Sequence, residues 1–331
     1  MQPNLPRPSA AREKRNVIIE VAAAVVLRAD GAFLLAQRPA GKVYAGWWEF
    51  PGGKLDAGES ASQALARELH EELGIHVQTA FPWITRVFTY PHGTVRLNFF
   101  RVTTWQGEPQ SREGQQLLWQ RIEDPLPTPM LDANLPVINA LQLPSIYAIT
   151  AASALGEQVF LQRLELALQR GVRLIQFREK SLPLNAFAAL AKQVISRAHA
   201  YGARVLINGT PAQAIALGAD GVHLTEIALH AMTKRPQGML VAASCHDAHA
   251  LAHAATLELD FVVLGAVAPT ASHPGAQGMG WSRFAELTHH STLPIYAIGG
   301  MQASDLPMSF ASGAHGVAMI RGAWPNAQSI T

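Results

Sequence analysis

The sequence has few of the features that mark secreted, membrane-bound or nucleic-acid-binding proteins. Cys245 is the only cysteine among 331 residues, so no disulfide can form within the chain, which suits a reducing compartment. Charged residues make up only 15% and the formal net charge is +2, so the composition gives no sign of nucleic-acid binding. The apolar run at residues 17–27 is too short to span a bilayer and is interrupted by Glu20. We therefore expect a soluble cytoplasmic protein with no signal peptide, membrane contact or nucleic-acid partner.

Apolar residues are plentiful at 49%, and the length suits two domains. Residues 1–16 are polar and rich in proline, which predicts a flexible tail. Residues 17–143 have a strand-rich pattern, whereas residues 144–331 alternate short apolar strands with helices. We expect the boundary within Gln142–Ser145, because Pro144 stands just before a new strand.

The first domain is predicted to combine strands with one clear amphipathic helix. Asp30-Gly31 lies between two apolar runs, which is a strong signal for a β-hairpin turn. A helix is expected over Ser60–Leu73, where Gly74 stops it, and a shorter one over Pro136–Leu141. The expected strands are Val21–Leu27, Ala32–Gln37, Trp83–Tyr90 and Thr94–Thr104.

Three glutamates of the longer predicted helix share one of its faces. Glu68, Glu71 and Glu72 have the spacing i, i+3 and i+4, so their carboxylates are neighbours. Like charges at this spacing destabilise a helix unless a cation lies among them. Mg²⁺ prefers oxygen ligands and leaves part of its coordination to water and substrate phosphate. A cation site for a di- or triphosphate is one interpretation, and a solvated acidic helix face is the other.

The longer string around these glutamates favours the cation site. It matches every fixed position of the pattern G-x5-E-x7-R-E-U-x-E-E-x-G-U. The matching residues are Gly53, Glu59, Arg67, Glu68, Leu69, Glu71, Glu72, Gly74 and Ile75. Residues 17–143 thus resemble the Nudix hydrolases. This resemblance implies an α/β/α sandwich with a mixed sheet and a metal-dependent hydrolase acting on phosphoric anhydrides.

Within that family the region looks most like the MutT type, whose members hydrolyse 8-oxo-dGTP to its monophosphate and so avoid mutation and DNA damage. The strings that carry the likeness are Trp48-Glu49-Phe50-Pro51-Gly52-Gly53, Gly107-Glu108-Pro109 and Arg112-Glu113-Gly114-Gln115. The resemblance implies a Mg²⁺ cofactor, with Mn²⁺ as the alternative ion. The implied metal ligands are the Gly52 carbonyl, Glu68, Glu71, Glu72 and Glu113, and the implied catalytic residues are the same four glutamates with Arg67.

Roles within this set follow from the same resemblance. Glu68 is expected to be the base that activates water, and Glu72 the most committed metal ligand. Arg67 is expected to orient the glutamates as a bidentate partner rather than to touch substrate. Glu59 would stabilise the helix start or support the metal ligands.

Recognition of the base is expected to involve residues outside this string. By resemblance Asn134 reads the edge of the oxidised guanine, because an amide carries both a donor and an acceptor. Its alternative role is to cap the helix that follows it. Arg38 matches a substrate-contacting arginine, and Phe50 and Tyr90 are candidates for packing on the base. Gly93 stands where the MutT-type pattern often has an arginine, so the nucleotide preference could differ.

The second domain contains eight apolar segments of strand length, with helices between many of them. Two of these helices are expected at Glu157–Arg170 and Asn185–Ala200. The alternation predicts a (β/α)₈ TIM barrel, with a doubly wound open sheet as the alternative. The expected strands are Ile146–Thr150, Arg173–Phe177, Arg204–Ile207, Gly221–Leu224, Leu240–Ala243, Phe261–Leu264, Ile295–Ile298 and Gly316–Ile320.

Strings at these strand ends resemble the thiamine phosphate synthase family, which includes a thiazole tautomerase. They are Tyr147-Ala-Ile-Thr150, Gln176-Phe-Arg-Glu-Lys180, Leu206-Ile-Asn208, Gly218-Ala-Asp-Gly-Val-His-Leu224, Ala297-Ile-Gly-Gly300 and Gly313-Ala-His-Gly-Val-Ala-Met319. Gly299 and Gly300 offer backbone N–H groups to a phosphate, or else only relieve crowding. His246 is a candidate acid/base, or a hydrogen-bonded bystander. The candidate residues for a phosphate or ligand site are Arg178, Lys180, Asn208, His246, Thr270, Gly299 and Gly300.

Departures from the family pattern argue against the synthase reaction itself. Asn208-Gly209-Thr210 stands where the pattern has Asn-Asp-Arg, and Ala228 stands where it has a second Asp, so both metal carboxylates are missing. The segment Pro269–Pro274 lacks both lysines of the diphosphate loop. A synthase must neutralise a leaving diphosphate, which carries several negative charges. We expect the barrel to bind thiazole phosphate or another phosphorylated ligand, as a sensor or a metal-free tautomerase, or to be an inert scaffold.

The leading hypothesis is a Mg²⁺-dependent nucleoside triphosphate pyrophosphohydrolase that converts 8-oxo-dGTP to 8-oxo-dGMP and diphosphate. One alternative is a Nudix hydrolase of thiamine-related diphosphates, suggested by the attached barrel. Another, which is not enzymatic, is that the barrel regulates or oligomerises the hydrolase.

Overall fold

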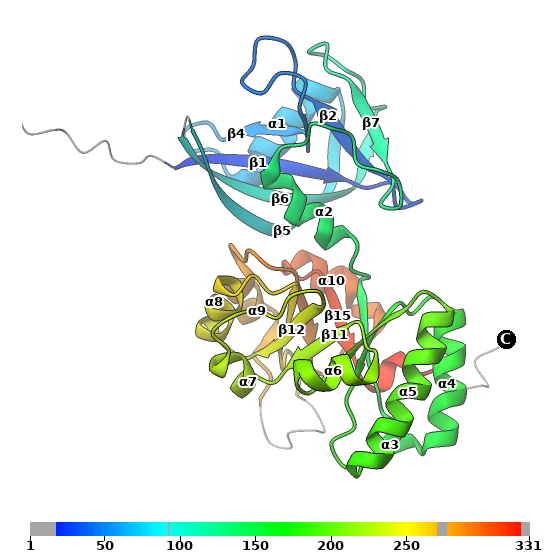
Figure 1. Cartoon of the computed structure of the whole chain (residues 1–331). Coiled ribbons are helices and arrows are strands. Elements are labelled where there is room, and N and C mark those ends of the chain that lie inside the picture. Colours follow the sequence, from blue (N-terminus) through cyan, green and yellow to red (C-terminus); the bar gives the residue numbers. More distant parts are fainter. Residues whose placement is uncertain (1–17, 92, 270–276, 326–331) are drawn as a thin grey trace, which may run out of the picture.

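The computed structural model describes residues 18–91, 93–269 and 277–325. The expected tail at residues 1–16 and the candidate ligand residue Thr270 lie outside these ranges. Figure 1 shows two units stacked on each other, with the N-terminal unit above the C-terminal one. In the described part of the chain, no helix is long and apolar enough to cross a membrane.

The N-terminal domain is built on two sheets. The larger has the order β4-β1-β6-β5 and is mixed, because β1 runs parallel to β6 while the other pairs are antiparallel. Its strands are β1 (Ile19–Val26), β4 (Gly52–Lys54), β5 (His76–Tyr90) and β6 (Gly93–Gln106). The smaller has the order β3-β2-β7 and consists of β2 (Phe33–Gln37), β3 (Trp48–Glu49) and β7 (Leu117–Gln120).

Successive residues of β1 face opposite sides, which gives the domain its layers. Ala22 and Ala24 belong to a core that includes buried residues of α1 (Ala61–Leu73). Ala23 and Val25 belong to a second core that includes residues of α2 (Leu135–Leu141). The expected α/β/α sandwich is therefore confirmed.

The helix α1 has a strong signal at each end. Ser60 caps its start: the hydroxyl accepts a bond from the backbone of Gln63, whose side chain accepts one from the backbone of Ser60. Gly74 ends it with φ of 73°, a left-handed conformation that glycine adopts without strain. The helix bounds expected from the sequence agree with these caps.

The expected strands are present, with two differences. The turn at Asp30-Gly31 forms, but β1 and β2 pair only through Leu27 and Phe33 and then join different sheets. β5 starts at His76, whereas the sequence predicted a start at Trp83 because Pro82 interrupts the strand pattern. β5 is the edge strand of its sheet, where a proline is tolerated.

The C-terminal domain is a closed barrel of eight parallel strands, so the open-sheet alternative is wrong. Its interior is filled by large side chains, among them Tyr147, Phe261 and Tyr296. The strands are β8 (Ile146–Ile149), β9 (Leu174–Phe177), β10 (Arg204–Asn208), β11 (Gly221–Leu224), β12 (Leu240–Cys245), β13 (Phe261–Gly265), β14 (Ile295–Ile298) and β15 (Gly316–Met319). The helices are α3 (Ala152–Leu155), α4 (Glu157–Gln169), α5 (Leu184–Ala200), α6 (Pro211–Leu217), α7 (Glu226–Ala231), α8 (Ala248–Thr256), α9 (Gly280–Thr288) and α10 (Leu306–Ala311).

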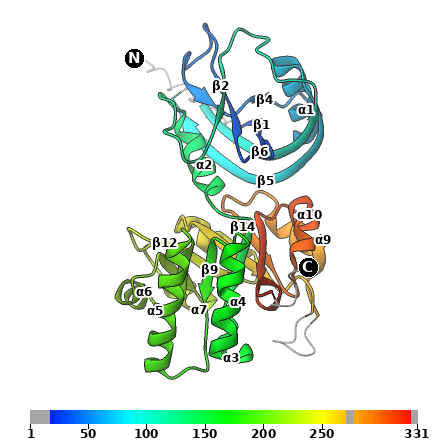
Figure 2. The same cartoon turned by 90° about the vertical axis from the view of Figure 1, so that its right-hand side faces the viewer.

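The N-terminal domain docks on the amino-terminal ends of the barrel strands. The backbone N–H of Thr85 in β5 donates to the Ser291 carbonyl at 2.8 Å, just before β14. The Arg101 guanidinium in β6 donates to the carbonyls of Ala314 at 2.6 Å and His315 at 3.0 Å, just before β15. In Figure 2, β5 accordingly lies against the barrel. The carboxyl ends of the strands, where barrel enzymes bind ligands, point away from the N-terminal domain.

The segment between the domains is held at this contact. The Leu143 carbonyl accepts a bond from His315 at 2.8 Å, and the Pro144 carbonyl accepts one from the Tyr296 hydroxyl at 2.5 Å. The Arg101 side chain is 7% exposed and its guanidinium lies 4.3 Å from the ring centre of Phe310. These contacts hold the two domains together through a short linking segment.

Candidate functional site

The glutamate face of α1 lies against the glycine pair that begins β4. A Cβ on Gly53 would lie 2.1 Å from the carboxyl carbon of Glu68, so only glycine leaves room for that carboxylate. A Cβ on Gly52 would lie 2.1 Å from the carbonyl oxygen of Ala22. Gly53 therefore lets the Glu68 side chain approach β4 closely, and Gly52 lets β4 approach β1.

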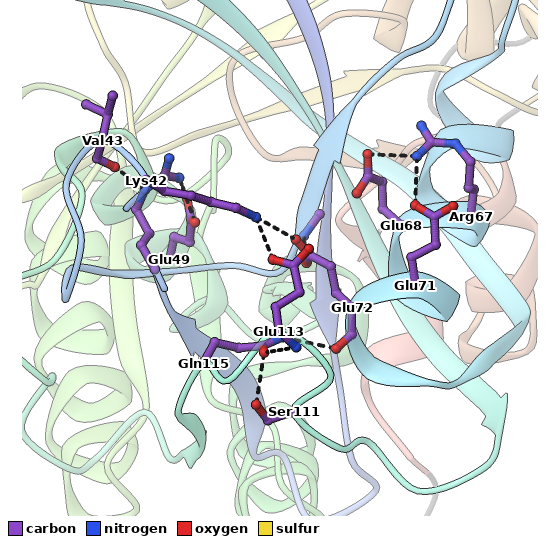
Figure 3. Close-up of polar contacts among 12 residues, drawn as sticks. Lys42, Val43, Glu49, Arg67, Glu68, Glu71, Glu72, Ser111, Glu113 and Gln115 are labelled. Carbon is purple, nitrogen blue, oxygen red and sulfur yellow. Dashed lines mark hydrogen bonds and ion pairs between the residues drawn. The ribbon is translucent and has the colours of Figure 1, made fainter. Parts of the chain in front are cut away.

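Arg67 holds the acidic side chains at one end of this site (Figure 3). Its guanidinium forms a two-bond fork with Glu59, at 3.0 and 2.9 Å. It also donates to Glu68 at 2.9 Å, to Glu71 at 3.3 Å and to the Lys54 carbonyl at 2.9 Å. The fork and the carbonyl bond fix the guanidinium, so its contact with Glu68 sets the position of that carboxylate.

Glu72 occupies the more enclosed part of the site. Its carboxylate accepts a bond from the backbone N–H of Gly52 at 3.3 Å, and 15% of its side chain is exposed. Burial raises the pKa of Glu72 to about 7; the charge of Lys42 opposes this increase, and the charges of Glu113 and Glu68 add to it. A nearby cation would reverse this effect, because it stabilises the charged form.

Glu113 reaches the site although it is far along the chain. Residues 110–115 are fastened to the end of α1: the backbone of Arg112 and the side chain of Gln115 both donate to the Glu72 carbonyl, at 3.1 and 3.0 Å. The Gln115 side chain also accepts a bond from the backbone of Glu113 at 2.9 Å. This clamp explains how the later string is brought beside the helix.

Lys42 is the residue that sequence analysis missed. Its ammonium donates to Glu113 at 2.5 Å and lies 4.0 Å from Glu72, so it stands between the two carboxylates (Figure 3). It comes from the loop after β2, and a lysine in a polar loop gives no local signal of such a contact. The glutamates are thus divided between two cations, Arg67 and Lys42.

The donor set fits a hard divalent cation by its chemistry. The backbone carbonyl of Gly52 and the four glutamates supply only oxygen, which Mg²⁺ and Mn²⁺ prefer. Glu72 is crowded by like charges that a dication would relieve. Across the described ranges no three acidic, histidine or cysteine side chains converge closely enough to hold one ion. Glu71 is the outlying member, with 58% of its side chain exposed.

Arg38 and Glu49 form a second polar pair beside the site. One guanidinium nitrogen of Arg38 donates to both Glu49 oxygens at 2.7 Å, and its Nε donates to the Val43 carbonyl at 2.6 Å. Burial raises the pKa of Glu49, and the charge of Arg38 opposes that increase. Burial and Glu49 raise the pKa of Tyr90 to about 12, so it remains a neutral phenol at physiological pH.

The candidate base-reading residues differ in where they lie. The Asn134 side chain is 4% exposed, makes no capping bond to α2, and its amide nitrogen has no partner among the described residues. Phe50 is 3% exposed and packs between Phe33 and Phe99, so it is a core residue rather than a surface for a base. At Gly93 a Cβ would meet nothing within 4 Å.

The barrel residues expected at a ligand site lie at or after the carboxyl ends of their strands. Arg178 and Lys180 follow β9, Asn208 ends β10, and His246 follows β12. Gly299 and Gly300 follow β14 with φ of 115° and 68°. The Nδ1 of His246 is 2.8 Å from the Gly265 carbonyl, which can only accept, so Nδ1 is the donor in this bond.

Comparison with known proteins identifies both halves. Residues 22–140 match the family model of the NUDIX domain, and residues 146–323 match that of thiamine monophosphate synthase. The 8-oxo-dGTP diphosphatase of Haemophilus influenzae is 45% identical over 102 residues, which cover 31% of this chain and 75% of that protein. The thiamine-phosphate synthase of Thioalkalivibrio sulfidiphilus is 32% identical over 187 residues, which cover 55% of this chain and 88% of that protein. The chain belongs to both families.

The Nudix half has a further relative with a different printed substrate. The CTP pyrophosphohydrolase of Escherichia coli is 41% identical over 123 residues, which cover 37% of this chain and 90% of that protein. The Nudix domain of this chain is therefore a hydrolase acting on phosphoric anhydrides, of a family that uses divalent cations. The synthase-type barrel belongs to a family whose ligands are phosphorylated.

Proposed function

We propose that the Nudix domain is a Mg²⁺-dependent nucleoside triphosphate pyrophosphohydrolase whose preferred substrate is 8-oxo-dGTP. The observation that carries the choice of substrate is Asn134. A buried amide without a partner costs free energy that a bound ligand can recover. The Asn134 side chain makes no capping bond to α2, which leaves its amide available to a ligand. An oxidised guanine presents both donors and acceptors on its edge, which an amide can match.

The metal would be held by the Gly52 carbonyl and by Glu68, Glu71, Glu72 and Glu113. When bound, the ion neutralises charge on the phosphates and makes a coordinated water more acidic. Manganese, which takes similar oxygen ligands, is the alternative ion.

The residues of the chain itself divide the remaining work. Glu68 takes a proton from the attacking water as its oxygen bonds to phosphorus, and the bridging P–O bond breaks to release a monophosphate and diphosphate. The carboxylate of Glu68 is positioned by its bond from Arg67 and by the absence of a side chain on Gly53. Glu72 has its carboxylate fixed by the Gly52 backbone, which suits a ligand that remains in place.

The first test is Glu72→Gln in the full-length protein. This substitution keeps the shape of the side chain and removes its charge, so release of diphosphate in the presence of Mg²⁺ should fall by at least about 10³-fold. Glu123→Gln makes the same chemical change at an exposed site of the same domain and should leave the rate unchanged. Substantial activity in Glu72→Gln would contradict the proposed metal site.

The second test compares substrates by kcat/KM, with 8-oxo-dGTP, dGTP, CTP and thiamine diphosphate assayed side by side. We expect 8-oxo-dGTP to lead. Asn134→Ala should reduce its kcat/KM by about 10- to 100-fold, as expected for loss of hydrogen bonds worth about 1–3 kcal/mol, and should change hydrolysis of the poorer nucleotides little. Equal losses on all nucleotides would contradict a role for Asn134 in reading the base.

A second candidate substrate is CTP. The Escherichia coli relative named as a CTP pyrophosphohydrolase supports it. A higher kcat/KM for CTP would establish this candidate, and a higher value for thiamine diphosphate would favour the thiamine-related alternative.

For the barrel we propose binding of a phosphorylated ligand such as thiazole phosphate, without synthase activity. Support comes from the place and backbone shape of Gly299 and Gly300, which follow β14 with φ of 115° and 68° and can present backbone N–H groups to a phosphate. A Cβ on Gly299 would also lie 2.8 Å from the Val267 nitrogen, so close packing requires glycine there as well. With Nδ1 of His246 bonded to the Gly265 carbonyl, Nε2 is the ring nitrogen left for proton transfer in a tautomerisation. Thiazole phosphate and inorganic phosphate should raise the melting temperature of the full-length protein, and no shift at millimolar ligand would favour an inert scaffold.

A further inference from the structure

The position of Lys42 is at odds with the chemistry expected around it. The two carboxylates that it touches, Glu72 and Glu113, are both expected ligands of a divalent cation. An ammonium 2.5 Å from one and 4.0 Å from the other occupies the space between them. A dication and a lysine cannot share that space, because two positive charges a few ångströms apart repel each other strongly.

The loop that carries Lys42 is anchored at its base. The backbone of Arg38 donates to the Trp47 carbonyl at 2.8 Å, and that of Gly46 donates to the Arg38 carbonyl at 2.9 Å. The side chain of Arg38 is itself held by Glu49 and Val43. These contacts bring residues 38 and 47 together, so that Lys42 projects from a closed loop.

The Lys42 side chain is held by fewer contacts than that of Arg67. Arg67 has bonds to four partners and only 28% of its side chain is exposed. Lys42 has one close partner, and 47% of its side chain is exposed. An exposed ion pair of this kind changes the equilibrium constant for its formation by a factor of only about 1.5 to 5. A bound dication can therefore displace the lysine from the carboxylates.

We propose that Lys42 fills the place of the divalent cation in the nucleotide-free enzyme and moves to a substrate phosphate when the metal and nucleotide bind. This inference rests on the proposed function. In the nucleotide-free state the ammonium compensates Glu72 and Glu113, which otherwise repel each other. Once the metal enters, the long lysine side chain is repelled from the carboxylates, and the phosphates of the substrate are the nearest anions that accompany the metal. The same residue thus weakens binding of the metal alone and strengthens binding of the metal–nucleotide complex.

The test measures these two effects separately, on the full-length protein and on Lys42→Met. Binding of Mn²⁺ alone, followed by the loss of the free-ion signal in electron paramagnetic resonance, should be about 3- to 10-fold tighter in Lys42→Met, because the competing cation is gone. KM for the Mg²⁺–nucleotide complex should rise by about tenfold in the same variant, since a charge-assisted contact to phosphate is lost. A merely structural role of Lys42 would weaken both.

Two further variants serve as controls. Lys42→Arg keeps the positive charge and should leave the Kd of Mn²⁺ near that of the wild type. Lys192→Met removes an exposed lysine from α5 of the barrel and should change neither quantity.

An unchanged Kd of Mn²⁺ in Lys42→Met would overturn the inference, as would an unchanged KM. Failure of the proposed function is distinguishable, because then the wild-type protein would bind no Mn²⁺ at this site and hydrolyse no nucleotide. If the wild type does both and Lys42→Met behaves like it, only the role of Lys42 is wrong.

Discussion

Gly53→Ala places one methyl group at the closest approach between β4 and α1. The new Cβ would lie 2.1 Å from the carboxyl carbon of Glu68 and 2.2 and 2.4 Å from its two oxygens. Ordinary contact begins at 3.4 Å, so the carboxylate must retreat by about 1.3 Å. The obstacle is the end of a flexible side chain, so the backbone can stay where it is.

The expected effects on activity and stability therefore differ. A displacement of about 1 Å in a catalytic group costs about 10²-fold in rate, so kcat/KM should fall by about 100-fold. The φ of Gly53 is not in the left-handed region, and the change from glycine to alanine restricts the unfolded chain. The free energy of unfolding should thus change by less than about 1 kcal/mol.

The assay is steady-state hydrolysis with Mg²⁺, together with thermal unfolding of the same samples. Gly58→Ala is the matched control: its φ of 83° makes alanine strained, yet its Cβ would meet nothing within 4 Å. It should lose about 1 kcal/mol of stability and keep its activity. A Gly53→Ala enzyme with activity near that of the wild type would refute the role of the Gly53–Glu68 approach.

Three further predictions concern pH and the contact between the domains. Burial and like charges raise the pKa of Glu72 from 4.5 to about 7, so the metal-free protein should lose stability as the pH rises from 4.5 to about 7. In EDTA, the melting temperature of the wild type should therefore fall over this pH range, whereas that of Glu72→Gln should not. Over the same window the apparent Kd of Mg²⁺, measured by calorimetry, should become about tenfold tighter per pH unit, because the metal binds the unprotonated carboxylate; a flat profile would contradict this. Arg101→Leu leaves the Ala314 and His315 carbonyls buried without their donor, so the free energy of unfolding should fall by about 2–4 kcal/mol while hydrolysis persists. An unchanged denaturation curve would show that Arg101 does not hold the domains together.

The features that could be predicted from sequence are those with a local cause. The helix α1 was predictable to within a residue, because Ser60 and Gly74 are end signals and the apolar spacing between them has the helical period. The eight barrel strands were predictable because buried parallel strands are short apolar runs between helices. The acidic face was visible for the same reason, since residues three and four apart on a helix are neighbours.

Other features depend on contacts between distant residues. The short strands β3, β4 and β7 have too few residues for a periodic pattern and exist through their pairing partners. Phe50 was a candidate for packing on the base, but the fold uses it in the core between two other phenylalanines. The expected barrel was right, whereas the face on which the first domain docks had no sequence signal.

From the residue spacing alone it follows that three glutamates share one helix face with an arginine next to them in sequence. The longer string around them resembles that of a hydrolase of phosphoric anhydrides. The groups that surround these side chains depend on contacts formed in the folded protein. The clamp of Arg112 and Gln115 on the end of α1 brings Glu113 to Glu72, and the loop after β2 brings Lys42 between them. The physical reason is range: caps and helical periodicity act over a few residues, whereas electrostatic pairing and packing act between any residues that the fold brings within a few ångströms.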